Sequence, residues 1–202
     1  MVQAPMVSLI LLLAAQAAPP PTTVYVVRHA EKAKGDNPPL TEAGQARAAA
    51  LAAALRDVEL DAVFTTNLCR TAQTVDATAQ AAGLSLQTIH VADTTLATCT
   101  PKLTAEVSRM PPAADAEQAL AAALRRLPAG SQALVAGHSN TIPRLLEALG
   151  AERLCPEAYP LDEQGRCWLP HPVFDNLFVV SLPKRGPVRA QHLHYGLPTP
   201  AR

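Results

Sequence analysis

The sequence has few aromatic side chains and no net charge. Phe, Trp and Tyr make up only 3% of its 202 residues, so Ala, Leu and Val must fill the core of a chain that is 49% hydrophobic. Lys and Arg number 17, as do Asp and Glu, which argues against a basic nucleic-acid-binding surface and against an acidic disordered chain. Heptads, longer repeats and Gly-X-Y tracts are also missing, which excludes coiled coils, solenoids and collagen. A chain of this length predicts one domain.

The start of the chain lacks charge and is apolar. Residues 7–15 form an apolar run about half as long as the ~18 residues that a membrane span needs. Ala15-Gln16-Ala17 fits the small-x-small pattern of a cleavage site, and three prolines follow at 19–21. We therefore expect a signal peptide over 1–17, a linker over 18–22, and a periplasmic or secreted protein with no stable membrane association after cleavage. Because residues 1–6 hold no Lys or Arg, a retained anchor or a misassigned start codon stays open.

The four cysteines include no C-x-x-C pair, which argues against a zinc knuckle or a thioredoxin-type motif. An even number of cysteines in an exported chain predicts two disulfides, for which three connectivities are possible. We favour Cys155–Cys167, which would close a short loop that contains Pro and Gly, and Cys69–Cys99. Four buried free thiols are the alternative.

Hydrophobic patterns predict alternating strands and helices. We expect strands at 23–27, 61–65, 86–91, 133–137, 176–181 and 190–195, and helices at 41–56, 70–82, 115–127 and 141–149. Thr41 is a natural N-cap for the first helix. This alternation predicts an α/β fold, a three-layer α/β/α sandwich with a mainly parallel central sheet. The domain is expected to span 23–196, with an irregular loop at 155–172 and a tail at 197–202.

Basic side chains follow three of the predicted strands. Arg28 and His29 come directly after the first strand, Arg70 begins the helix after the second, and His138 follows the fourth at a helix start. Ligands of such sheets bind beyond the carboxyl ends of the strands, so these four side chains are expected at one edge. Arg offers a planar fork of donors that matches phosphate oxygens, and a neutral imidazole can attack phosphorus. The sequence therefore predicts a phosphate site.

Four segments, in this order along the chain, together resemble the histidine phosphatase superfamily. This family includes the cofactor-dependent phosphoglycerate mutases and the phosphohistidine phosphatases. The similar segments are Val24 to Lys32, Leu40 to Gly44, Thr65 to Thr71 and Gly137 to Thr141, and the similarity runs from about Thr22 to Tyr195. The resemblance implies a phosphoglycerate mutase-like fold.

The resemblance also implies roles for the four basic side chains. His29 would be the nucleophile and would form a phosphohistidine intermediate. Arg28 and Arg70 would clamp the phosphoryl oxygens, and His138 would donate to the same oxygens and stabilise charge in the transition state. No cofactor or metal is implied, because two arginines and a second histidine supply the positive charge.

An acid must protonate the leaving alkoxide, and several carboxylates are candidates for it. In many relatives the acid lies just after the third strand, a position nearest to Asp93 here, although Asp93 can also be a turn residue. Glu31 is a second candidate, with orientation of the catalytic loop as its alternative role, and Glu106 is a third. Asn140 is a possible supporting residue. Without an acid in the pocket, good leaving groups such as those of phosphoramidates or acyl phosphates would be preferred.

Two other features each have a structural and a functional interpretation. His192 and His194 share one face of the last strand and could bind a metal, but no third ligand is evident, so a structural role is favoured. Trp168 and His171 lie in the 155–172 loop, which could cover the pocket and touch substrate or could be a surface decoration.

The expected function is an exported phosphatase that hydrolyses small phosphomonoesters, or phosphoramidates, through phospho-His29. A phosphohistidine phosphatase and a non-catalytic phosphate- or phosphosugar-binding protein are the alternatives. A serine hydrolase with an elbow at 137–141 is a third, but Thr141 stands where the G-x-S-x-G motif needs Gly. No nucleic-acid partner is expected, and the oligomeric state stays open.

Overall fold

A single seven-stranded sheet organises the chain. The computed structural model describes residues 18–151 and 159–199. The strands lie in the order β4-β3-β2-β5-β1-β6-β7. Their bounds are β1 (Thr22–Arg28), β2 (Ala62–Thr66), β3 (Leu86–Ile89), β4 (Val107–Arg109), β5 (Gln132–Gly137), β6 (Asn176–Leu182) and β7 (Arg189–His194). The first five pair in parallel, and β6 and β7 extend the sheet beyond β1 as antiparallel strands.

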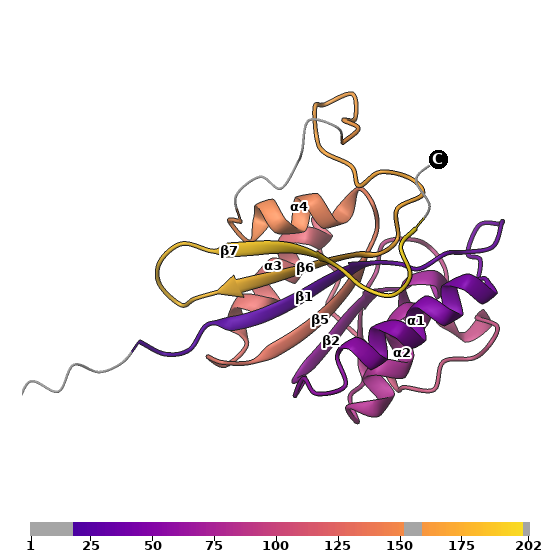
Figure 1. Ribbon diagram of the computed structural model, residues 1–202, viewed down its shortest axis with the longest axis horizontal. Helices are drawn as coiled ribbons and strands as arrows, with labels where there is room; N and C mark the ends of the chain where they lie inside the picture. The colour runs from indigo at the N-terminus through magenta and orange to yellow at the C-terminus, as the bar shows by residue number, and fades with distance from the viewer. Residues whose placement is uncertain (1–17, 152–158, 200–202) are drawn as a thin grey trace, which may run out of the picture.

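Helices cover both faces of this sheet (Figure 1). The helix α1 (Glu42–Ala54) packs beside α2 (Cys69–Ala81) on one face, and α3 (Ala116–Arg126) packs beside α4 (Thr141–Ala148) on the other. A short 3₁₀ turn, η1, spans Leu96–Thr98. The predicted three-layer α/β/α sandwich with a mainly parallel sheet is confirmed. The side-chain hydroxyl of Thr41 accepts from the Gly44 N–H, so the expected N-cap of α1 is confirmed as well.

The alternation of side chains along β1 shows where the core sits. Val24 and Val26 pack into the cluster beneath α3 and α4, whereas Val27 packs into the cluster beneath α1 and α2. All three are fully buried, because helices cover both faces of this central strand. Phe64 and Phe178 are the largest fully buried side chains, and aliphatic residues fill most of the remaining core.

The limits of the domain differ slightly from the expectation. The strand β1 begins at Thr22, inside the segment expected to be a linker. In the expected tail, Leu197 and Thr199 hydrogen-bond to the Arg47 guanidinium and so belong to the folded domain. The expected signal peptide at 1–17 lies outside the described residues, as does Cys155, so the Cys155–Cys167 bridge stays a prediction. No helix within 18–151 and 159–199 has the length and apolar character that a membrane crossing requires.

Candidate active site

The parallel pairing of β1 with β5 brings two histidines together. Arg28 at the end of β1 is in register with Gly137 at the end of β5. The His29 N–H donates to the Gly137 carbonyl over 2.9 Å, so the two strand ends stay side by side. His138 follows Gly137 directly, and its ring centroid lies 5.5 Å from that of His29. Two motifs more than 100 residues apart in sequence thus form one site.

One cleft at this end of the sheet is lined by all four basic residues of the predicted phosphate site, Arg28, His29, Arg70 and His138. Asn140, expected as a supporting residue, lines the same cleft at the start of α4. The sequence-based expectation that strand ends would gather these side chains therefore matches their placement in the structure.

His29 is held as a neutral imidazole with one free ring nitrogen. The residue is only 5% exposed, and its burial is the main cause that lowers its pKa to about 3. The nearby charges of Arg28 and Arg70 act in the same direction, and the hydrogen bond to Ala30 opposes them. The His29 Nδ1 lies 2.8 Å from the Ala30 carbonyl oxygen, which can only accept, so Nδ1 carries the proton. The lone pair is therefore on Nε2, for which the described chain provides no hydrogen-bond partner.

Arg28 is fixed by the segment that precedes β6. Its Nη1 donates to the carbonyls of Pro170 and Val173, each over 2.9 Å, and its guanidinium carbon lies 4.4 Å from the centre of the Phe174 ring. Arg28 is 3% exposed, and this burial lowers its pKa to about 10, so it stays charged at neutral pH. Its buried Nε has no hydrogen-bond partner among the described residues. The arginine is thus oriented in advance and still has a donor to offer.

Arg70 is positioned by the start of α2. Its neighbour Cys69 is the first residue of this helix and is bonded to Cys99, so the expected Cys69–Cys99 disulfide is present. The Cys69 N–H also donates to the Asn37 side-chain oxygen over 2.9 Å. Burial lowers the pKa of Arg70, and its Nε is a second buried donor that has no partner within the described chain.

His138 lies at the end of a short chain of hydroxyl groups. Its Nε2 is 3.1 Å from the Thr66 hydroxyl oxygen, which is 2.6 Å from the hydroxyl oxygen of Thr71. Burial lowers the pKa of His138 to about 3, and the charges of Arg70 and Arg28 add to this effect. Like His29, it is therefore neutral at physiological pH.

Three carboxylates line the described part of the cleft: Glu31, Asp115 and Glu117. Glu31 is occupied by the buried Arg47, whose Nε lies 3.0 Å from both carboxylate oxygens and whose Nη2 lies 2.8 Å from one of them. This ion pair anchors the loop that follows His29. Asp115 is exposed and caps α3, because its Oδ1 accepts from the Gln118 N–H.

The structure does not bring Asp93 to the cleft. Asn67 holds the backbone of its loop, because the Asn67 amide donates to the carbonyls of Ala92 and Thr94 over 2.7 and 3.2 Å. The Asp93 side chain is exposed and lies outside the lining of the cleft. Glu106 is also exposed and does not line it. Of the carboxylates considered from the sequence, only Glu31 lies at the site.

Part of the 155–172 loop reaches the cleft. His171 and Pro172 line it together with Phe174, whereas Trp168 does not. Phe174 was missed from the sequence, although it lies under the Arg28 guanidinium and its ring centroid is 5.9 Å from that of His29. Its only signal in the sequence is that an aromatic residue stands just before a predicted strand.

The two histidines of the last strand lie elsewhere. His192 Nε2 is 2.7 Å from the Asn176 side-chain oxygen, and His194 pairs with Asp175 over 3.2 Å. A group of three or more His, Cys, Asp or Glu side chains suited to a metal is not found within 18–151 and 159–199. These contacts are those of structural residues.

Comparisons with known proteins agree with this geometry. Residues 24–93 match the family model of the histidine phosphatase superfamily (branch 1), and no curated protein matches the chain. A candidate phosphohistidine phosphatase SixA from Agrobacterium tumefaciens superposes with a TM-score of 0.51 at 22% identity, covering 89% of this chain and 99% of that one. SixA from Nakamurella multipartitia, likewise a candidate phosphohistidine phosphatase, gives 0.50 at 21% identity, covering 89% and 97%. YhfR from Bacillus stearothermophilus gives 0.50 at 19% identity, covering 79% and 91%.

These solved structures share the fold with the described chain, and the family model covers the segment that holds three of the four basic residues. The resemblance seen in the motifs is thereby confirmed. Residues 24–93 are therefore similar to the histidine phosphatase superfamily (branch 1), and the described chain shares its fold with solved structures of two candidate phosphohistidine phosphatases.

Proposed function

We propose that this protein is an exported histidine-type phosphatase that hydrolyses small phosphomonoesters through a phosphohistidine on His29. One observation carries the proposal. Three arginines that line the cleft, Arg28, Arg70 and Arg144, each have a buried Nε without a partner in the described chain, and the Nε2 lone pair of His29 has none either. Buried polar groups are normally paired, so these groups in one cleft indicate a ligand that accepts from guanidinium groups and is attacked by the imidazole. A phosphoryl group has that chemistry.

The arginines bind and orient the phosphoryl group. Charge-assisted hydrogen bonds from guanidinium to phosphate are among the strongest in proteins, and burial of Arg28 and Arg70 strengthens them further. Because the Pro170 and Val173 carbonyls already hold Arg28, little reorganisation is needed when the substrate arrives. Binding thus places phosphorus in front of His29.

Transfer then uses the His29 Nε2 lone pair. Nε2 forms a bond to phosphorus while the bond from phosphorus to the ester oxygen breaks, and the ester oxygen leaves with the electron pair. The Ala30 carbonyl stabilises the positive charge that develops on the ring, because it accepts the Nδ1 proton in a hydrogen bond. Water attacks the phosphohistidine next, which releases inorganic phosphate and restores the ring.

His138 stabilises the transferring group from the side of β5. The Thr71 hydroxyl donates to the Leu68 carbonyl over 2.8 Å, so the Thr66 hydroxyl donates to Thr71 and accepts from His138 Nε2. The His138 ring is thereby fixed beside His29, where its dipole acts on the phosphoryl group as negative charge develops. Positioning and fixed charge of this kind supply most of the catalysis in phosphoryl transfer.

Export is supported by cysteine chemistry and by the start of the sequence. The Cys69–Cys99 bridge is of a kind that persists in oxidising compartments. The apolar run at 7–15 and the small residues after it have the pattern of a signal peptide. Lys32, Lys34 and Arg144 also line the cleft, which suits small anionic substrates.

Trapping of the intermediate tests the proposal. The purified wild-type protein should hydrolyse p-nitrophenyl phosphate, and acid-labile phosphate should be found on His29 by mass spectrometry after rapid quenching. His29→Ala should lower kcat/KM by at least about 10³-fold and abolish the phosphoenzyme, because no nucleophile is left. His192→Ala, a histidine substitution outside the cleft, is the matched control and should change kcat/KM by less than about twofold.

Two outcomes would contradict the proposal. Turnover that survives in His29→Ala would exclude the covalent mechanism. Binding of inorganic phosphate in a calorimeter, without turnover of any phosphate ester, would instead indicate the non-catalytic binding protein.

A further inference from the structure

The leaving group needs a proton, and the structure points to a residue that the motifs do not include. We propose that Glu117, in the first turn of α3, is the general acid of the reaction, an inference that rests on the phosphatase function proposed above. Elimination within the cleft is the first argument. Of the three carboxylates that line it within the described residues, Glu31 is bound by Arg47 and Asp115 caps α3. The Glu117 carboxyl group has neither a hydrogen bond nor an ion pair with any described residue.

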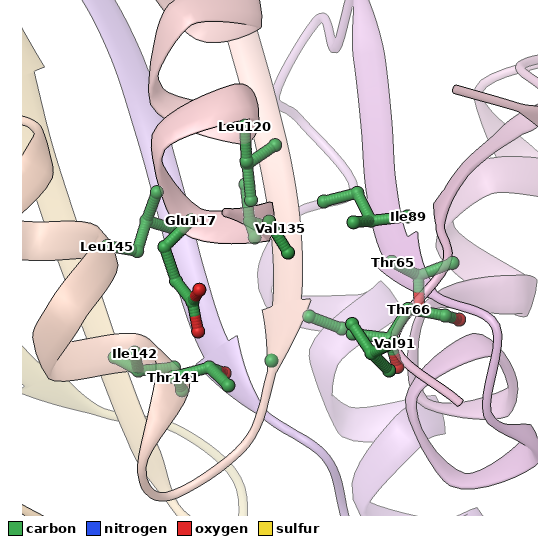
Figure 2. A pocket seen from close by; sticks show the side chains of 13 residues that line it. Thr65, Thr66, Ile89, Val91, Glu117, Leu120, Val135, Thr141, Ile142 and Leu145 are labelled. Carbon is green, nitrogen blue, oxygen red and sulfur yellow. The ribbon is translucent and has the colours of Figure 1, made fainter. Parts of the chain in front are cut away.

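The position of Glu117 is the second argument. It lines both the cleft with Arg28, His29, Arg70 and His138 and a small adjoining apolar pocket. Figure 2 shows its side chain extending from α3 towards Thr141 and Ile142, at the start of the helix that follows His138. The carboxyl group therefore lies on the His138 side of the cleft.

The surroundings of Glu117 are the third argument. Leu120, Val135, Ile142 and Leu145 line the adjoining pocket, so one side of the carboxyl group is apolar. The carboxyl group thus lies at the boundary between this apolar pocket and the cleft that the arginines line.

Glu117 would give up one proton and regain one proton in each turnover. As the bond between phosphorus and the ester oxygen breaks, that oxygen takes the Glu117 proton and leaves as an alcohol. The Glu117 carboxylate next accepts a proton from the water that attacks the phosphohistidine. The nitrogen–phosphorus bond breaks, inorganic phosphate is released, and Glu117 ends the turnover as the acid that began it.

A series of leaving groups tests the role. The probes are p-nitrophenyl phosphate, phenyl phosphate and an alkyl phosphate such as glycerol 2-phosphate. The leaving oxygen becomes more basic in this order, so its departure depends increasingly on a proton donor. Glu117→Gln keeps the shape of the side chain and removes the proton. It should lower kcat/KM for the alkyl phosphate by about 10²–10³-fold, yet lower that for p-nitrophenyl phosphate by less than about fivefold. Glu117→Asp should recover part of the alkyl phosphate activity.

Glu147→Gln makes the same substitution on the exposed side of α4, outside the cleft, and should change neither activity. An equal loss for every leaving group in Glu117→Gln would overturn the acid role while the phosphatase function stands. The same would follow if Asp93→Asn, and not Glu117→Gln, gave the leaving-group-dependent loss. If the wild-type protein hydrolyses none of the three probes, the phosphatase function itself fails and the acid role fails with it.

Discussion

At the residue scale, the two buried imidazoles link folding to pH. Their pKa values of about 3 in the folded protein lie well below the value of about 6.5 expected in the unfolded chain. As the pH falls below 6.5, the unfolded chain takes up protons that the folded chain does not, so the free energy of unfolding falls. The stability from neutral burial is complete above pH 6.5 and is lost on the way down to about pH 3.

This predicts a measurable difference in one variant. When the pH is lowered from 6.5 to 5, protonation of His29 in the unfolded chain should by itself lower the unfolding free energy of the wild-type protein by about 1.5 kcal/mol. His29→Gln should lose less over the same interval, because one of the two titrating groups is gone. Denaturant titrations at several pH values measure both slopes, and equal slopes would show that His29 is not buried as a neutral base.

The grouping of the four basic residues in one cleft could be predicted from the sequence because each lies at, or soon after, the end of a strand. Arg28 ends β1 and His138 follows β5, and the parallel register of these two strands brings the two residues to the same edge of the sheet. Phe174 and Glu117 could not be predicted in this way. The position of Phe174 depends on the path of the irregular segment that leads into the antiparallel strand β6, and this path has no sequence pattern. Glu117 lies in the first turn of α3, where acidic residues are common because they complement the helix dipole, so its sequence position does not indicate a function.

Asp93 failed as a candidate for a related reason. The strand expected over 86–91 ends at Ile89, and Asn67 then binds the backbone of the following loop. The side chain that the spacing placed near phosphate is thereby left in solvent. Such side-chain-to-backbone contacts between distant loops leave no periodic signal in a sequence.

At the element scale, the Cys69–Cys99 bridge joins the first residue of α2 to the residue that follows η1. The bridge closes a loop across a sequence separation of 30 residues, which by chain entropy should stabilise the fold by about 3.6 kcal/mol. A Cys69→Ala/Cys99→Ala variant should therefore lose about that much unfolding free energy. Its kcat/KM for p-nitrophenyl phosphate should also fall, because Arg70 follows Cys69 directly.

Chemical denaturation and steady-state kinetics measure the two effects. Cys99→Ala alone is the internal comparison, and it should lose as much as the double variant because either change removes the bridge. Unchanged stability and activity in the double variant would show that α2 begins at Cys69 without help from the disulfide.

The type of most elements follows from local pattern, and the exceptions are β4 and the short 3₁₀ turn η1. Six strands and four α-helices occur within a few residues of their predicted bounds, because apolar runs and caps mark them. The strand β4 has only three residues, all exposed, at the edge of the sheet. A short exposed segment with no apolar alternation carries no strand signal, so only its pairing with β3 defines it.

At the scale of the whole molecule, the end of the domain supports the site from a distance. Thr199 accepts the Phe174 N–H over 3.0 Å, and Phe174 lies against the Arg28 guanidinium. Arg47 joins the same region to the loop that follows His29, because it binds both Glu31 and the Leu197 carbonyl. The residues expected to be a tail thus connect to both sides of the cleft.

Removal of the Thr199 hydroxyl should therefore weaken substrate binding. Thr199→Ala should raise KM for p-nitrophenyl phosphate by about fivefold, in line with the roughly 1 kcal/mol of a lost hydrogen bond. Thr199→Ser keeps the hydroxyl and should behave as the wild-type protein. Steady-state kinetics compare the two variants, and equal KM values would show that Phe174 is held without Thr199.

The strand order has a consequence for how the protein is made. The strand β5 lies between β1 and β2 in the sheet, although it follows both in the chain. A nascent chain that ends before residue 132 already contains Arg28, His29 and Arg70. It still lacks β5, the strand that lies between β1 and β2 in the sheet. The cleft therefore forms only once β5 has been synthesised and added to the sheet, late in the synthesis of the chain.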